Sequence, residues 1–142
     1  MRLLPAILLS LALAAAPARA VIDDAYSTAL EAAIDYVKQG FKLRQEYWKG
    51  TVTGTGEKIV KHQVFKGSDV WFWLGTDSES GVAFEIEAYD AKGVKITLEK
   101  KAGKGWTSVH FKPEKTGTCL VTFKITGKDK EVIPWALVYG WK

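Results

Sequence analysis

The chain has 142 residues, of which 20 are Lys or Arg and 16 are Asp or Glu, giving a formal net charge of +4. This length suits a single domain, and so small a net charge makes no general electrostatic case for binding nucleic acid. Cys119 is the only cysteine, which excludes an intramolecular disulfide.

The first 20 residues have the pattern of a secretory signal peptide. A short basic start, Met1-Arg2, precedes an almost wholly apolar run at residues 3–16, and small residues then lead to Ala20 in an A-x-A cleavage pattern. The run is shorter than the roughly 20 residues that span a bilayer, so no membrane span is expected. We expect cleavage near Ala20, a periplasmic or secreted location, and a single domain at residues 21–142. Cleavage would also remove two arginines and bring the chain closer to neutrality.

Residues 23–39 have the period of an amphipathic helix. Apolar side chains recur at three- and four-residue steps and form one stripe, Tyr26, Leu30, Ala33, Ile34 and Val37. Asp23 or Asp24 can cap the N-terminus, and Gly40 can take the left-handed position that ends a helix. We expect this helix to bury its stripe against a sheet.

After Gly40 the period changes to two, which is typical of β-strands. The strands expected from alternation lie at 41–48, 58–65, 69–75, 82–89, 94–99, 106–112, 118–126 and 132–141. Residues 50–56 are expected to form a turn-rich segment, and residues 100–105 a basic, glycine-containing loop. Turn signals about every eight to twelve residues predict an antiparallel β-sandwich or jelly roll of about eight strands.

Two of these strands are apolar on both faces. In the strand at 69–75, Val70, Phe72 and Leu74 point one way, while Trp71 and Trp73 point the other way. The strand at 132–141 shows the same double apolarity. Both faces of such a strand need cover, so we expect the two strands to lie side by side beneath the N-terminal helix. The predicted fold is mainly β, with one N-terminal amphipathic helix packed on one sheet.

Three later segments share motifs with a known family. They are KGSDVWFW at 66–73, EAYDAKG at 87–93 and FKPEKTGTC at 111–119. In this order they resemble the Gly-x-x-aromatic-x-Phe strand, the Tyr-Asp-x-x-Gly hairpin and the Pro-x-x-x-Gly-x-Tyr strand entry of the bacterial pre-peptidase C-terminal domain and its β-sandwich relatives. The resemblance covers about residues 59–142 and implies a secreted, non-catalytic accessory or binding domain.

Two departures from that family affect what the resemblance implies. Many members carry an Asp-x-Asp-Leu strand before the hairpin, where this chain has Phe84-Glu85-Ile86-Glu87. Cys119 stands where an aromatic residue is common; in this alternating strand we expect it to be a small buried hydrophobe. No calcium ligand set carries over from the family.

Tryptophans and lysines supply the candidate ligand-binding residues. Four of the six tryptophans, at 71, 73, 135 and 141, lie on the strands with two apolar faces and are expected in the core. The candidates for exposure are Trp48 and Trp106, and Trp106 follows the basic residues Lys100, Lys101 and Lys104. These five residues predict a site where an indole stacks on a sugar ring and lysines hold an acidic glycan or a phosphate. Solvated lysines on a loop are the simpler interpretation.

Catalytic and metal sites have little support in the sequence. The two histidines, His62 and His110, show no zinc-ligand spacing, and no G-x-S-x-G motif is present. Asp77, Glu79 and Asp90 could line a calcium loop, but their spacing matches no calcium motif, so we expect no cofactor and no metal.

The sequence therefore predicts an exported, non-catalytic binding or structural module. Its ligand stays open, with a glycan or another exported protein as the candidate partners. The first alternative is a carbohydrate-binding protein that uses exposed tryptophan and the basic loop. The second is a small secreted hydrolase that uses His110 with a serine such as Ser68 or Ser108.

Overall fold

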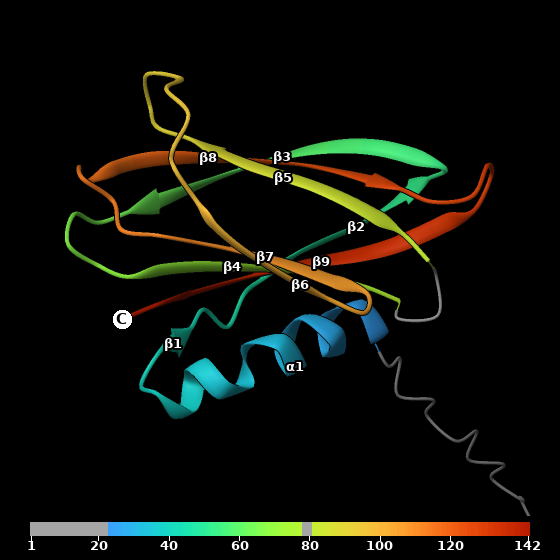
Figure 1. The fold of residues 1–142 in the computed structure, drawn as a ribbon, viewed down its shortest axis with the longest axis horizontal. Helices are drawn as coiled ribbons and strands as arrows, with labels where there is room; N and C mark the ends of the chain where they lie inside the picture. Colours follow the sequence, from blue (N-terminus) through green and yellow to red (C-terminus); the bar gives the residue numbers. More distant parts are fainter. Residues whose placement is uncertain (1–22, 78–80) are drawn as a thin grey trace, which may run out of the picture.

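The computed structural model describes residues 23–77 and 81–142. In these ranges one helix and nine strands are arranged in three layers: the helix, a six-stranded sheet and a three-stranded sheet (Figure 1). The expected signal peptide lies outside the described residues. Within them, no helix combines the length and the apolar character needed to cross a bilayer.

The elements follow one another along the chain with the helix first. They are α1 (Asp24–Lys38), β1 (Lys42–Leu43), β2 (Trp48–Thr53), β3 (Thr55–Val64), β4 (Val70–Thr76), β5 (Ala83–Tyr89), β6 (Glu99–Gly103), β7 (Trp106–Phe111), β8 (Gly117–Thr126) and β9 (Val132–Trp141).

The strands form two antiparallel sheets, which confirms the predicted β-sandwich with a single helix. The larger sheet has the order β1-β9-β4-β7-β6, and β2 pairs with another stretch of β9; the smaller sheet has the order β3-β8-β5. The two strands with two apolar faces, β4 and β9, are neighbours, with Trp73 opposite Val138 and Leu74 opposite Leu137. Helix α1 covers the outer face of the larger sheet (Figure 1).

The main core lies between the two sheets and is built from the inward-facing side chains of both. It includes Val70, Phe72, Leu74, Val121, Phe123, Ile125 and Leu137. Cys119 belongs to this core and is 1% exposed, as expected of a small buried hydrophobe. Burial raises the pKa of its thiol to about 11.

A second, smaller core lies between α1 and the larger sheet. It is formed by Ala29, Ala33, Phe41, Trp71, Trp73 and Val138. The helix approaches β4 closely at Gly75, where an added Cβ atom would lie 2.4 Å from the carbonyl oxygen of Ala25 and 2.6 Å from the amide nitrogen of Ala29. At this point backbone packs on backbone, because Gly75 has no side chain to hold the helix away.

The buried face of α1 differs from the predicted apolar stripe. Ala25, Ala29 and Ala33 are buried, whereas Ile34 is 53% exposed and Val37 is 42% exposed. The large indoles of β4 already fill the space over the sheet, so small side chains lie beneath the helix. Ile34 and Val37 face outward instead, and Leu30 is half-buried.

The start of α1 is fixed by Asp23, one of the two predicted caps. One carboxylate oxygen of Asp23 accepts a hydrogen bond from the backbone N–H of Tyr26 at 3.0 Å, and the other accepts one from the Tyr47 hydroxyl at 3.0 Å. The Tyr26 and Tyr47 rings stack with their centroids 3.8 Å apart. Gly40 follows the helix with φ of 101°, the left-handed conformation expected of it.

Three predicted segments fold differently from the expectation. Residues 50–56 are not a turn, because β2 extends to Thr53 and the chain reverses at Gly54. Residues 94–98 make only one bridge, between Lys95 and Tyr89, as the chain crosses there from the smaller sheet to the larger one, and Glu99 already belongs to β6. Only residues 104–105 of the basic segment 100–105 form a turn, because residues 100–103 belong to β6. This edge strand has only exposed residues, so its sequence lacks the apolar alternation that predicts a strand.

Candidate functional site

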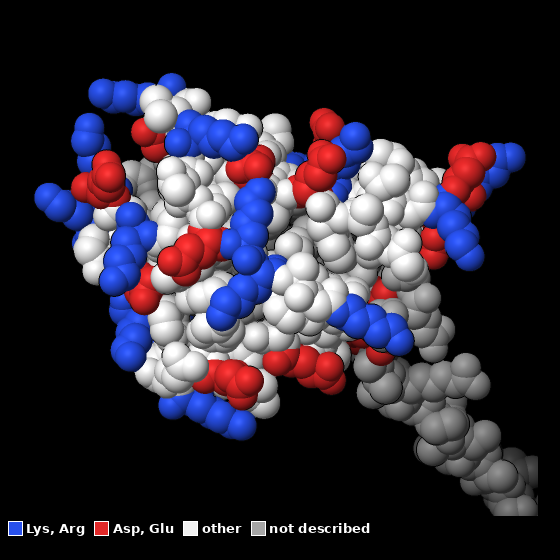
Figure 2. Space-filling view, viewed as in Figure 1, with Lys and Arg blue, Asp and Glu red and all other residues white. Residues whose placement is uncertain are grey.

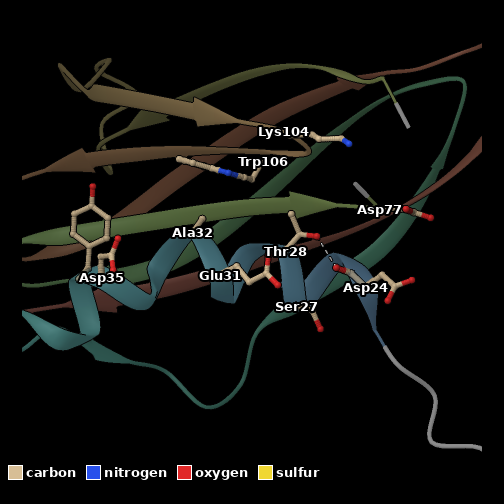
Figure 3. Close-up of a pocket in the computed structure, with 10 residues that line it drawn as sticks. Asp24, Ser27, Thr28, Glu31, Ala32, Asp35, Asp77, Lys104 and Trp106 are labelled. Carbon is tan, nitrogen blue, oxygen red and sulfur yellow. Dashed lines mark hydrogen bonds between the residues drawn. The ribbon is translucent and has the colours of Figure 1, made fainter. Parts of the chain in front are cut away.

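A groove of about 780 Å³ runs between α1 and the tip of the β6–β7 hairpin (Figure 3). Its lining residues come from the helix, from the end of β4 and from the hairpin: Asp24, Ser27, Thr28, Glu31, Ala32, Asp35, Tyr36, Asp77, Lys104 and Trp106. Sites for small ligands commonly have volumes of about 300–1,000 Å³. The groove is therefore large enough to be a ligand site.

The helix wall of the groove is acidic. Asp24, Glu31 and Asp35 are seven and four residues apart, a spacing that puts them on one face of a helix. Glu31 forms no ion pair with any residue in the described ranges, while Asp35 lies 3.9 Å from the exposed Lys38 ammonium. Figure 2 shows acidic side chains along the lower edge of the molecule, where α1 lies in Figure 1. The opposite wall thus faces a row of carboxylates.

The hairpin wall presents the Trp106 indole and the Lys104 ammonium. An added Cβ atom at Gly103 would lie 2.4 Å from Nε1 of Trp106, so the ring rests on a glycine that leaves room for it. Gly105 has φ of 77° in the turn, and its carbonyl oxygen accepts hydrogen bonds from the Thr76 amide at 2.8 Å and the Thr76 hydroxyl at 3.1 Å. These two bonds fix the hairpin tip to the end of β4.

Lys101 lies at the Tyr36 side of the groove. Its ammonium donates a hydrogen bond to the Tyr36 hydroxyl at 2.9 Å and stands 5.4 Å from the centre of the Tyr36 ring. It is also 5.7 Å from the centre of the Trp71 ring. The hydrogen bond to Tyr36 raises the pKa of Lys101 above its ordinary value. This lysine is therefore a charged side chain held in place by aromatic neighbours.

The five residues predicted as a ligand site are not all brought together. Trp106 and Lys104 line the groove, and Lys101 contacts Tyr36 beside it. The ammonium of Lys100 instead lies 2.7 Å from the Glu87 carboxylate of β5, because successive residues of a strand point to opposite faces.

Trp48 lies apart from the groove altogether. It pairs with Leu137 on the face of the larger sheet that points into the sandwich, and its ring contacts Phe72 and the edge of His62. Trp106 pairs with Gly75, and a Cβ atom added at Gly75 would point toward α1. The two tryptophans therefore lie on opposite faces of the larger sheet and cannot hold one sugar ring between them.

Sequence reasoning missed the carboxylates of α1. Their helical spacing was visible, but a polar helix face is ordinarily solvated. Only the docking of α1 on Gly75 places this face opposite the Trp106 hairpin.

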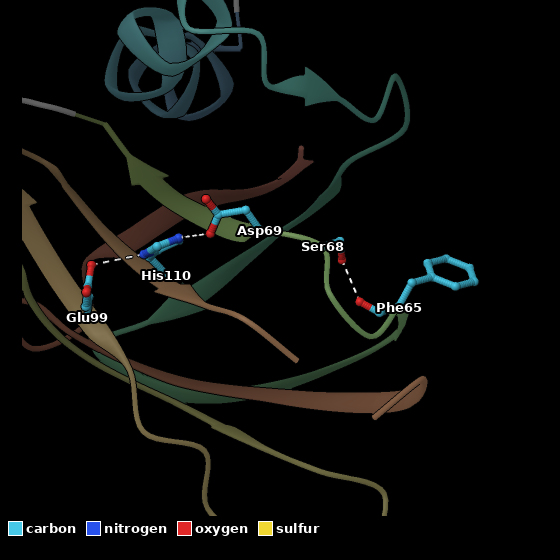
Figure 4. Close-up of polar contacts among 5 residues, drawn as sticks. All are labelled: Phe65, Ser68, Asp69, Glu99 and His110. Atoms are coloured by element: carbon cyan, nitrogen blue, oxygen red, sulfur yellow. Dashed lines mark hydrogen bonds and ion pairs between the residues drawn. The ribbon is translucent and has the colours of Figure 1, made fainter. Parts of the chain in front are cut away.

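His110 lies in a polar cluster with two carboxylates (Figure 4). Its Nδ1 is 3.0 Å from a Glu99 carboxylate oxygen, and its Nε2 contacts a carboxylate oxygen of Asp69. The imidazole also stacks on Trp71, with ring centroids 4.5 Å apart and planes 19° from parallel. Both ring nitrogens are thus engaged by carboxylates.

Neither serine considered for a hydrolase contacts His110. The Ser68 hydroxyl donates to the Phe65 carbonyl oxygen at 2.7 Å (Figure 4). The buried Ser108 hydroxyl lies 3.5 Å from the Lys101 carbonyl oxygen. A general base must lie within hydrogen-bond reach of the proton that it removes, and this geometry offers His110 no such partner among the described residues.

The considered calcium ligands do not form a recognisable metal site. No group of three or more His, Cys, Asp or Glu side chains in residues 23–77 and 81–142 is arranged to hold a metal ion. The Asp90 carboxylate accepts hydrogen bonds from the backbone N–H groups of Lys92 and Val94, both at 2.9 Å, and so stabilises its own turn. Glu79 lies outside the described residues.

Comparison with known proteins adds no relative: no family model matches the chain, and no curated protein matches it. The resemblance to the pre-peptidase C-terminal domain therefore stays a prediction.

Proposed function

We propose that this protein is an exported, non-catalytic binding module that holds a basic segment of another exported protein in the groove between α1 and the β6–β7 hairpin. The observation that carries the proposal is the acidic face of α1 standing across from the partly exposed Trp106 indole. Export itself follows from the signal-peptide pattern at residues 1–20.

The charges of the groove favour a cationic ligand. Asp24, Glu31 and Asp35 line the helix wall, and a cation near them is attracted, whereas an acidic glycan or phosphate is repelled. A cation over an indole face gains about 0.5–2 kcal/mol, more when water is excluded. Trp106 and the carboxylates can therefore act on the same Lys or Arg side chain from two sides.

The length of the groove favours a peptide over a single small cation. Asp24 and Asp35 are eleven residues apart in α1, and a rise of about 1.5 Å per residue separates them by about 16 Å along the helix axis. An extended peptide covers this distance in about five residues at roughly 3.3 Å each. A segment with two or three basic residues can thus meet the carboxylates in succession.

A binding role also agrees with the surroundings of His110. Its two nitrogens are occupied by Glu99 and Asp69, and its ring is stacked on Trp71. Such contacts link β6, β7 and β4, so His110 has a structural role there.

The test is a titration of the full chain with a lysine-containing pentapeptide, followed by tryptophan fluorescence and calorimetry. We expect saturable binding that weakens with added salt and falls by about threefold to tenfold in Glu31→Gln, because that variant removes one carboxylate facing the ligand. Glu57→Gln is the matched control, since Glu57 is an exposed carboxylate on β3 of the smaller sheet.

Two results would contradict the proposal. One is equal affinity of the wild type, Glu31→Gln and Glu57→Gln for the peptide. The other is binding of a neutral oligosaccharide, lost in Trp106→Ala, without any binding of the peptide; that outcome would support the carbohydrate-binding alternative.

A further inference from the structure

A second cleft, of about 300 Å³, opens at the edge of the sandwich between β3 and β9. It is lined by Arg44, His62, Gln63, Phe65, Tyr139 and Trp141. Trp141 and Tyr139 belong to the face of the larger sheet that points into the sandwich, since they pair with Val70 and Phe72 of the main core. The cleft is therefore an open continuation of the core.

Aromatic side chains form most of the wall of this cleft. Trp141 stacks on Tyr139 with centroids 5.4 Å apart and planes 16° from parallel, and the His62 ring meets Tyr139 edge-on at 4.2 Å. Phe65 stands at the mouth with 57% of its surface exposed. Exposing so large an apolar side chain beside a cleft is unfavourable in water, and a flat apolar ring would cover it.

Arg44 supplies the positive charge of the cleft and is held in place. Its backbone N–H donates to the Tyr139 carbonyl oxygen at 2.9 Å, and its guanidinium carbon stands 5.3 Å from the centre of the Trp48 ring. The guanidinium pairs at 3.0 Å with Glu46, whose side chain is 84% exposed. A pair this exposed contributes little to stability, so a ligand carboxylate can readily take the place of Glu46.

His62 adds an unpaired polar group. Its imidazole is half-buried and makes ring contacts, but neither nitrogen forms a hydrogen bond with a residue in the described part of the chain. Burial, and to a lesser extent the charge of Arg44, lowers the pKa of His62. The ring is thus neutral at neutral pH and offers one donor and one acceptor.

We infer that this cleft binds a small aromatic carboxylic acid, with its ring against Phe65 and Trp141 and its carboxylate on the guanidinium of Arg44. The volume suits a single ring. Arg44 is the one cationic side chain among the residues that line the cleft, and most of the other lining residues are aromatic. This lining suits one carboxylate on a flat apolar ring better than it suits the several hydroxyls of a sugar acid. This site is independent of the α1 groove and does not rest on the function proposed for it.

The test compares three ligands on the full chain by NMR, following the His62 imidazole and the Trp141 indole. Benzoate carries the ring and the carboxylate, benzyl alcohol carries the ring alone, and glucuronate carries a carboxylate on a sugar ring. We expect saturable shifts with benzoate and binding weaker by about tenfold or more for the other two, because each lacks one of the two contacts. This comparison needs no variant.

Variants then locate the carboxylate. Arg44→Gln should weaken benzoate by about tenfold, whereas Lys42→Gln, which removes a neighbouring exposed cation that does not line the cleft, should leave the affinity unchanged within about twofold. Equal binding of benzoate and benzyl alcohol, tighter binding of glucuronate, or no shift with benzoate at millimolar concentration would each overturn the inference.

Discussion

The contact between Gly75 and α1 gives the sharpest prediction for stability. In Gly75→Ala the new Cβ atom would lie 2.4 Å from the Ala25 carbonyl oxygen, 2.6 Å from the Ala29 amide nitrogen and 3.0 Å from the Ala29 Cβ. Ordinary van der Waals contact begins near 3.4 Å. The helix must therefore move by roughly 1 Å away from β4, because two of the three contacts are with its backbone.

We expect this displacement to lower the free energy of unfolding by about 2–3 kcal/mol. Overpacking a well-packed core costs about 1–3 kcal/mol, and here the strain falls on the backbone, which cannot change rotamer. This is a large part of the roughly 5–15 kcal/mol that stabilises a typical domain. Urea unfolding monitored by tryptophan fluorescence measures the change.

Gly117→Ala is the matched control for this prediction. Gly117 also lies in a strand, has no unusual backbone conformation, and an added Cβ would meet nothing within 4 Å. It should change stability by less than about 0.5 kcal/mol. The double variant Gly75→Ala with Ala29→Gly should recover little of the lost stability, since the two shortest contacts of the new Cβ atom are with backbone atoms. A Gly75→Ala protein as stable as the control would refute the close docking of α1.

Two further predictions concern single side chains. Asp23→Ala should lower stability by about 1–2 kcal/mol in thermal or urea unfolding because it removes both the cap on the Tyr26 amide and the partner of the Tyr47 hydroxyl. Asp23→Asn, which keeps a capping oxygen, should lose clearly less stability. Equal losses of stability in the two variants would argue against the cap. For Cys119, burial favours the protonated thiol in the folded state. The contribution of this thiol to the free energy of unfolding is therefore fully present below pH about 9 and is lost as pH rises toward about 11. Cys119→Ala should flatten the stability profile over that interval, and native Cys119 should react with a thiol reagent far more slowly than the unfolded chain; an unchanged profile or a fast native reaction would contradict the burial of the thiol.

Local patterns predicted the elements whose structure depends on neighbouring residues. The helix, its Asp23 cap and the Gly40 terminus follow from spacing within a few residues. The double apolarity of β4 and β9 also predicted their position side by side beneath the helix. In both cases only one arrangement of the segment buries its apolar side chains and leaves its polar side chains in water.

Features that depend on tertiary contact could not be read in this way. The apolar stripe of α1 pointed to Ile34 and Val37 as buried, but the close approach of the helix at Gly75 places Ala25 and Ala29 against the sheet instead. The edge strand β6 carries Lys100 and Lys101 and has no buried residue, so it resembles a loop in sequence. Charged edges of this kind protect a sheet from pairing with another chain.

The candidate site was predicted only in part for the same reason. Trp106 and Lys104 were identified from the sequence and do line the groove, whereas Trp48 lies in the sandwich and Lys100 pairs with Glu87. Which face of a strand a side chain occupies depends on register, and a shift of one residue reverses every side chain.

The place of β9 in the larger sheet has a consequence for the order of folding. This strand is the last element of the chain, yet it pairs with β4 on one side and with β1 and β2 on the other. Helix α1, the first element in the described part of the chain, rests on β4 and β9 together. Since contacts between distant parts of a chain form slowly, the helix has no complete surface to dock on until the final ten-residue strand is in place. Strand β9 must therefore be in place before either core is closed, and the smaller core closes only when α1 meets β9.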